Sequence, residues 1–333
     1  MPNEHLELVW TACPPDSPAA LLGGLCYGPA GETGLPEVAM ARLGASRPDL
    51  PLFSLFASRQ PVEHARFGAL RVWRHPDCLF AALSVEEDAY GGALSSLREA
   101  SRVAYHALFD VLEKEGYSAP WRFWNYLADI HGDENGLERY RQFNYGRQQA
   151  FADAGRSVNA AVPAACALGS QSGPLVVAVL AGREPALAIE NPRQVSAYDY
   201  PSDYGPRAPT FARASVSWLE GRPQLWLSGT ASIVGHRTLH AGDVAEQTRE
   251  TLRNIRTVLE ETRRRLPEAD FPLAALHYTV YLRHPEHQPL VAELLGAEVG
   301  AKLNAVYLKA DVCRADLLVE IEASAGHPLR VAP

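Results

Sequence analysis

The sequence is poor in several features that mark whole classes of protein. Its five cysteines are scattered and include no CxxC pair, so neither a zinc site nor a redox dithiol is expected. No uncharged apolar run approaches the ~18 residues of a membrane span. The first residues lack a basic stretch, and we expect no signal peptide. These absences predict a reduced, cytoplasmic protein without a metal site.

Composition is that of an ordinary folded protein. Hydrophobic residues make up 47% and charged residues 21% of the chain, which is typical of a globular protein. The formal net charge of -8 disfavours nucleic acid or an anionic membrane as a partner. A length of 333 residues exceeds the ~150 residues of a typical domain, so two domains are expected.

The second half of the chain has a readable order of elements. Asp243 and Glu246 have the spacing of a capping box, and apolar residues then recur at helical spacing to about Leu266. Residues 276–282 alternate between two sets of side chains in the manner of a strand. The other elements expected here are a helix at 288–303 and strands at 211–219, 224–234, 305–311 and 317–323.

The first half repeats this order. Strands are expected at 67–73, 79–84, 122–130 and 175–180, with helices near 94–115 and 137–154. The shared order of strand, strand, helix, strand, helix, strand indicates two α+β domains of one ancestral type. We place them at residues 1–183 and 184–333. The link is expected at Arg183–Pro209, where proline, glycine, tyrosine and aspartate cluster.

Glu320 and Glu322 are candidate catalytic groups. They alternate with apolar residues over Val319–Ala323, so on a strand both carboxylates share one face. Two carboxylates in one pocket raise each other's pKa, and a carboxylic acid that stays protonated near pH 7 is suited to general acid catalysis. A solvated strand face is the alternative. The sequence does not decide which glutamate is the acid.

Cys313 precedes Glu320 by seven residues and falls between the last two expected strands. A cysteine in that place can be a nucleophile, a weak hydrogen-bond donor or a small space-filling residue. Packing is the usual role of a lone cysteine.

Three segments combine arginine with aromatic residues, namely 140–147, 198–207 and 211–213. Arginine binds carboxylates through a two-pronged fork, and tyrosine adds a donor beside an apolar wall. Together the segments are suited to a small, partly apolar polyanion. Surface ion pairs are the alternative for each one taken alone.

Several segments resemble known families. The helix that begins after Gly242-Asp243, with the terminal Val319–Ala323 segment, is similar to the RidA/YjgF superfamily. More specific segments resemble the chorismatases, and this resemblance extends over most of the chain. They are FNYGR at 143–147, YG at 204–205, PTFARA at 209–214, LSGTASIVG at 227–235, and Cys313 with Glu320.

This resemblance implies a fold and an activity. The fold is α+β, with two RidA/YjgF-like (chorismate mutase-like) halves whose mixed sheets are each covered on one face by helices, and the active site lies in the C-terminal half. The activity is cleavage of the enol ether of chorismate to pyruvate, without a metal or organic cofactor. Hydroxybenzoate-forming members carry a cysteine and a glycine where Cys313 and Gly229 stand, whereas alanine is common there in hydrolytic members. The expected product is therefore 3-hydroxybenzoate, alone or with 4-hydroxybenzoate.

The resemblance also implies roles for single residues. Glu320 is the general acid that protonates the vinyl methylene carbon of chorismate. Cys313 lies against the ring and helps to exclude water. The substrate-binding residues are Arg213 and Arg147 for the carboxylates, Tyr145 and Tyr204 to orient them, Lys309 to offset the enolpyruvyl charge, Gly229 with Thr230 to make room for the ring, and Phe211.

Two other functions remain open from the sequence. An enamine or imine deaminase of the RidA type would need an arginine near Ala305, and no arginine lies between His284 and Cys313. A non-catalytic module that binds a small anion would need the arginines but not Glu320. A chain with two such halves can build its site internally, so either a monomer or a small homo-oligomer is expected.

Overall fold

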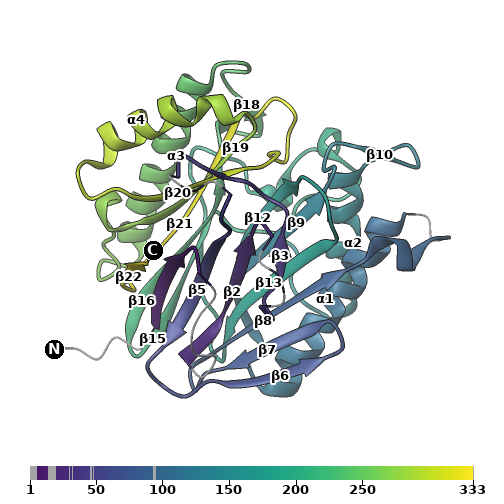
Figure 1. Ribbon diagram of the computed structural model, residues 1–333. Helices are drawn as coiled ribbons and strands as arrows, with labels where there is room; N and C mark the ends of the chain where they lie inside the picture. The colour runs from purple at the N-terminus through teal and green to yellow at the C-terminus, as the bar shows by residue number, and fades with distance from the viewer. Residues whose placement is uncertain are drawn as a thin grey trace.

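The computed structural model describes residues 6–13, 20–29, 31, 33–45, 47, 49–92 and 95–332. They form three large β-sheets, two short ribbons and four α-helices (Figure 1). Residues 1–5, on which the expectation about a signal peptide partly rests, and Leu94, at the expected start of a helix, lie outside the described residues. In the described part of the chain, no helix combines the length and apolar character needed to cross a membrane.

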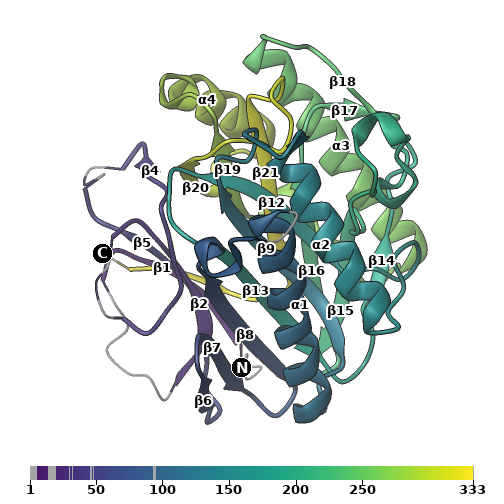
Figure 2. The ribbon, with the colours of Figure 1, turned by 90° about the vertical axis from the view of Figure 1, so that its right-hand side faces the viewer.

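The sheet of the N-terminal half is mixed and carries two helices on one face (Figure 2). Its strand order is β12-β9-β13-β8-β7-β6, in which only β12 and β9 run parallel. The elements are β6 (Glu63–Phe67), β7 (Leu70–Arg74), β8 (Cys78–Val85), α1 (Ser96–Glu115), β9 (Ala119–Ala128), the ribbon β10 (Asp133–Glu134) and β11 (Leu137–Glu138), α2 (Arg139–Asp153), β12 (Ala164–Ser170) and β13 (Leu175–Gly182).

The sheet of the C-terminal half is built in the same way. Its strand order is β14-β15-β16-β21-β19-β20-β4, and α3 and α4 cover one face. The elements are β4 (Arg42–Leu43), β14 (Leu187–Ile189), β15 (Ala214–Leu219), β16 (Arg222–Thr230), the ribbon β17 (Ile233–Val234) and β18 (Arg237–Thr238), α3 (Val244–Arg265), β19 (His277–Leu282), α4 (Gln288–Val299), β20 (Asn304–Lys309) and β21 (Val319–Ala325).

The two halves share one topology. Each half has five main strands, which can be numbered first to fifth along the chain. Across the sheet they lie in the order fourth, third, fifth, second, first. This order is β12-β9-β13-β8-β7 in the N-terminal half and β20-β19-β21-β16-β15 in the C-terminal half. The third and fourth strands are parallel in both sheets, and the other pairs are antiparallel. The predicted α+β class and internal repeat are therefore confirmed. The division at residues 183 and 184 stays a prediction.

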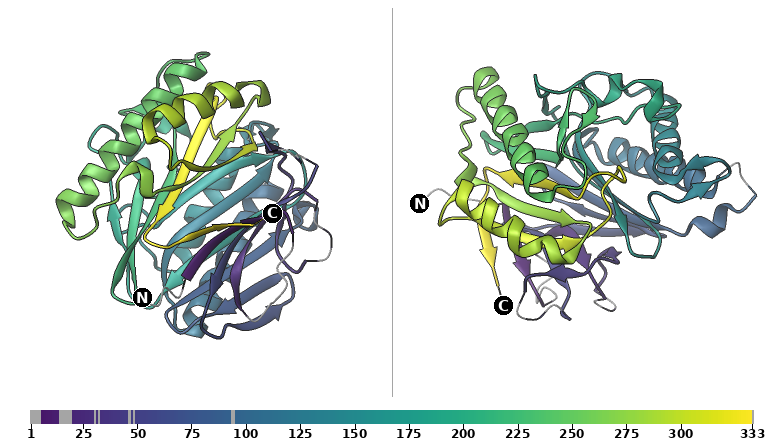
Figure 3. Two further views of the ribbon diagram at one scale, coloured as in Figure 1. Left: turned by 60° about the vertical axis from the view of Figure 1, so that its left-hand side comes forward. Right: turned by 90° about the horizontal axis from the view of Figure 1, so that it is seen from above.

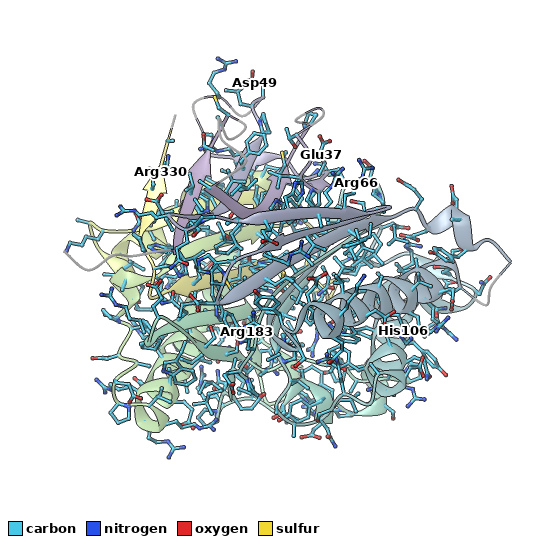
Figure 4. The ribbon with its side chains drawn as sticks, turned by 90° about the horizontal axis from the view of Figure 1, so that it is seen from below. Glu37, Asp49, Arg66, His106, Arg183 and Arg330 are labelled. Atoms are coloured by element: carbon cyan, nitrogen blue, oxygen red, sulfur yellow. The ribbon has the colours of Figure 1, made fainter. Side chains whose placement is uncertain are left out.

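A third sheet, which the sequence analysis did not predict, joins the two ends of the chain. Its order is β22-β1-β5-β2-β3, from β1 (Leu6–Thr11), β2 (Leu21–Tyr27), β3 (Glu37–Val38), β5 (Leu52–Ser58) and β22 (Leu329–Val331). Seen from above, it lies against the inner sides of the other sheets, while the helices lie outside (Figure 3). Figure 4 shows Glu37 and Asp49 on its outer side and His106 on α1 at the opposite, helical side.

Strand alternation assigns each side chain to one of two cores. On β21, Val319, Ile321 and Ala323 pack beneath α3 and α4. The intervening Glu320 and Glu322 face the interior between the sheets and are only 4% and 6% exposed. The alternative of a solvated strand face is therefore wrong.

Local signals explain where elements begin and end. The Asp243 side chain accepts the Glu246 N–H at 3.0 Å and caps α3, as predicted. The return bond of a full capping box is absent, because the Asp243 N–H donates to His240 O and the Glu246 carboxylate pairs with Arg249. The second C-terminal helix ends at Val299, earlier than expected, because Gly300 has a φ of +87°.

Candidate active site

A cavity of about 250 Å³ lies between α2, the segment 194–213 and the inner face of the C-terminal sheet. Its volume is close to the lower end of the ~300–1,000 Å³ typical of small-molecule sites. Six of the predicted site residues line it, namely Glu320, Cys313, Arg213, Tyr204, Phe211 and Gly229. All three arginine–aromatic segments noted in the sequence contribute to the wall.

Glu320 is the buried acid of this cavity. It is 4% exposed and stands on β21 opposite Tyr281 of β19. Burial raises the pKa of its carboxyl to about 8, and the nearby Glu322 carboxylate adds to this rise, against the opposing charges of Arg122 and Arg213. A group with this pKa is largely protonated at neutral pH and able to donate a proton.

Glu322 is in a different environment from Glu320. It accepts hydrogen bonds from the buried Arg122 and from the Tyr281 hydroxyl, the latter at 2.9 Å. It does not line the cavity that contains Glu320. The two carboxylates of one strand face are therefore distinguished by their partners, and Glu320 is the one that faces the cavity.

Gly229 makes room for the Glu320 carboxyl group. A Cβ at residue 229 would lie 1.9 Å from Oε1 and 2.7 Å from Cδ of Glu320. No side chain larger than hydrogen fits there unless Glu320 moves. The space at Gly229 thus accommodates the acid. Gly229 also lines the cavity, and its predicted role in making room for the substrate ring stays a prediction.

Cys313 lies beside the acid. Its Sγ is 4.0 Å from Oε2 of Glu320, and burial together with the Glu320 charge raises the pKa of the thiol to about 12. The sulfur is therefore a neutral thiol at physiological pH. This environment favours packing over a nucleophilic role, because the thiolate is the nucleophile.

Two arginines on the cavity wall form no salt bridge with a carboxylate of the described residues, although the charge of Arg213 acts on the buried Glu190 carboxyl. Arg213 Nη2 donates to Val195 O at 2.8 Å and to Tyr200 Oη at 2.9 Å. Arg314 stacks on the Tyr204 ring at 4.2 Å and donates to His236 O. Arg213 Nε and Arg314 Nη2 are buried without a hydrogen-bond partner. Since buried cationic donors are costly to leave unpaired, the wall is suited to a bound anion.

Four predicted binding residues do not line the cavity. Arg147 is 2% exposed and donates to Asn144 Oδ1 at 2.8 Å, and it lies two helical turns, ~10 Å along α2, beyond Tyr140 of the wall. Tyr145 contacts Arg98 and Arg207 instead, at 4.1 Å and 5.2 Å from its ring centre.

Strand register places the other two on the opposite face of the sheet. Lys309 pairs with Leu282, which pairs with Val319 of the core beneath the helices. Thr230 pairs with Ile321 of the same core, and its hydroxyl donates to Ser228 O at 2.8 Å. Their side chains therefore point away from the face that carries Glu320.

Sequence reasoning missed Arg314 as a site residue. Its only signal was its place directly after Cys313. Tyr140, Arg141 and Tyr200 also line the cavity; they were part of the arginine–aromatic segments but were not selected individually.

Comparisons with known proteins agree with this geometry. Residues 54–181 match the family model described as "Chorismatase FkbO/Hyg5-like, N-terminal". The chain is 43% identical to a 3-hydroxybenzoate synthase of Streptomyces hygroscopicus over 67% of its own length and 68% of the relative. It is 35% identical to a chorismatase of Streptomyces rapamycinicus over 83% of each chain. A chorismatase crystal structure superposes with a TM-score of 0.84 at 30% identity, covering 97% of this chain and 98% of that one. The chain therefore belongs to the chorismatase family.

Proposed function

We propose that the chain cleaves the enol ether of chorismate to pyruvate and a hydroxybenzoate. The observation that carries this proposal is Glu320, a buried carboxyl with a pKa of about 8 that faces a cavity beside two arginines, each with a buried donor that has no hydrogen-bond partner. A relative named as a 3-hydroxybenzoate synthase supports the product class.

Substrate binding follows from the charges of the cavity wall. Chorismate carries two carboxylates. Among the described residues of the wall, Arg213 and Arg314 are the cations with a buried donor that has no hydrogen-bond partner, whereas Arg141 is paired with Glu138. We assign the carboxylates to these arginines and not to Arg147 or Lys309, which lie outside the cavity lining. The rings of Tyr204 and Phe211 give the apolar walls that a cyclohexadiene ring requires.

Bond cleavage begins with a proton from Glu320. The carboxyl group protonates the vinyl methylene carbon, which becomes the pyruvate methyl group and leaves an oxocarbenium-like centre. The neighbouring ring hydroxyl then displaces the protonated enolpyruvyl group from its ring carbon. The ether oxygen leaves with this group and becomes the keto oxygen of pyruvate. The ring fragment releases one proton as it becomes a hydroxybenzoate, and the Glu320 carboxylate accepts it. The two products contain all the atoms of chorismate, so no water is consumed.

Cys313 bears on the choice between this route and hydrolysis. A neutral thiol 4.0 Å from Glu320 Oε2 occupies space beside the reacting group. Water competes with the ring hydroxyl for reaction with the protonated enolpyruvyl group of the substrate. Because the Cys313 sulfur occupies the space beside Glu320, it excludes water there and favours hydroxybenzoate over the dihydroxy acid that hydrolysis gives.

The test is to incubate the purified protein with chorismate and to measure pyruvate by a coupled lactate dehydrogenase assay. Chromatography identifies the aromatic product. We expect equal amounts of pyruvate and hydroxybenzoate, with 3-hydroxybenzoate alone or together with the 4-isomer. Absence of pyruvate above the spontaneous background would contradict the proposal.

A further inference from the structure

Glu322 anchors a buried polar network that takes no direct part in the reaction steps above. Its side chain accepts hydrogen bonds from Arg122 and Tyr281, and Arg122 is itself 2% exposed. The arginine–carboxylate pair thus lies wholly in the interior, between the N-terminal and C-terminal sheets. Such a pair holds both side chains in a fixed place.

A chain of three phenols ends at the same carboxylate. The Tyr27 and Tyr126 hydroxyls are 2.8 Å apart, and the Tyr126 and Tyr281 hydroxyls are 3.0 Å apart. Each phenol has one proton to donate. Because Tyr281 donates to Glu322, Tyr126 must donate to Tyr281, and Tyr27 must donate to Tyr126. The three donors are therefore aligned toward Glu322, and each strengthens the next.

A small cavity with both apolar and polar walls completes the surroundings of Glu322. It has a volume of about 40 Å³ and is lined by Arg122, His277 and Glu322 among others. Arg122 Nη1 and His277 Nδ1 are buried without a protein partner. The volume is enough for ordered water, which would link the Arg122 donor to the carboxylate. His277 Nδ1 is an acceptor for such water, because Nε2 of the same ring donates to His327 O at 2.9 Å.

The proposed reaction sets what this network has to supply. Glu320 gives one proton and takes one back, so no net proton crosses the protein and a proton conduit is not required. What the reaction does require is that Glu320 begins each cycle protonated and that its carboxylate recovers a proton readily.

Resting on the proposed function, we propose that Glu322 is a positioning residue. Its fixed negative charge, held by Arg122 and the aligned tyrosines, keeps the proton on Glu320 until chorismate takes it. The same charge makes the resulting Glu320 carboxylate a ready base for the returning proton.

The electrostatics of the site support this role. The groups that face Glu320 are Glu322, Arg122, Arg213, Cys313, Tyr140 and Cys166. Burial raises the pKa of both thiols and of the phenol, which leaves Glu322 as the one anion of this set. Alternate residues of a strand stand ~7 Å apart. At that distance and an effective dielectric constant of ~20, a unit charge shifts a neighbouring pKa by about one to two units.

An infrared titration tests the role without substrate. Protein labelled with ¹³C in the glutamate carboxyl groups is titrated, and the difference between wild type and Glu320→Gln isolates the signal of Glu320. In Glu322→Gln we expect the protonation midpoint of Glu320 to fall by about one to two pH units. The pH at which kcat declines on the basic side of its pH profile should decrease by the same amount.

A second variant covers the risk that Glu322→Gln does not fold, since it leaves Arg122 buried and unpaired. The double variant Arg122→Gln/Glu322→Gln removes both charges, and the midpoint of Glu320 should still fall, by less. The matched control is Glu115→Gln, which breaks the 2.7 Å Arg74–Glu115 pair outside the cavity and should leave the midpoint in place.

The outcomes separate the two proposals. An unchanged or higher midpoint in both Glu322 variants would overturn the positioning role, even if the wild type releases pyruvate from chorismate. If the wild type releases none, the proposed function fails. A lower midpoint in that case still supports the effect of Glu322 on Glu320, because the titration uses no chorismate.

Discussion

Gly229→Ala is a sharp test of the site geometry, because it adds one methyl group directly against the acid. The new Cβ would lie 1.9 Å from Glu320 Oε1, so the carboxyl must move by about 1.5 Å to reach ordinary van der Waals contact. A displacement of ~1 Å of a reacting group costs on the order of 100-fold in rate. We expect kcat for pyruvate release to fall by about 10- to 100-fold, with a smaller change in KM.

The assay is steady-state pyruvate release from chorismate, with thermal unfolding of each variant as a check on folding. Gly296→Ala is the matched control, because a Cβ at Gly296 of α4 meets nothing within 4 Å and the substitution should leave kcat unchanged. If Gly229→Ala folds and keeps kcat within twofold of the wild type, the placement of the Glu320 carboxyl is not what limits the reaction, and the reasoning is refuted.

Three further predictions concern the same cavity. Cys313→Ala should keep pyruvate release but shift the aromatic product toward the dihydroxy acid, because the lost sulfur opens room for about one water; an unchanged product ratio by chromatography would make Cys313 filler. Arg213→Ala and Arg314→Ala should each weaken chorismate binding in calorimetry by about 2–3 kcal/mol, or ~30- to 150-fold, since each removes a charged hydrogen bond; unchanged affinity would remove that arginine from the site. The kcat–pH profile should be level below pH 7 and fall as the pH rises through about 8, because only protonated Glu320 donates; a profile level to pH 10 would contradict the assignment.

Much of the C-terminal half could be predicted because its elements carry strong local signals. The cap at Asp243 and the periodic apolar residues of α3 define that helix, and alternation places Glu320 and Glu322 on one face. The sheet formed by β1, β2 and β5 was missed because its strands do not alternate. All seven residues of β2 are buried, and a strand covered on both faces has no polar face to give the pattern.

The limits of the site prediction have a similar physical origin. Lys309 and Thr230 were placed near the substrate by their position in the sequence, but strand register decides the face, and a shift of one residue reverses it. Arg147 lies on the same helix as Tyr140, yet two turns beyond the cavity wall. The role of Gly229 depends on a contact with a residue 91 positions away in the chain, which no local pattern reports.

The most direct test of the account is single-turnover pyruvate release by Glu320→Gln, with Glu322→Gln beside it. The amide keeps the shape of the carboxyl but has no proton to give, so we expect release to slow by at least ~100-fold, with chorismate affinity nearly unchanged. Glu322→Gln should retain release at low pH, where Glu320 is still protonated. Near-wild-type release by Glu320→Gln, or loss of release at every pH in a folded Glu322→Gln, would contradict Glu320 as the proton donor.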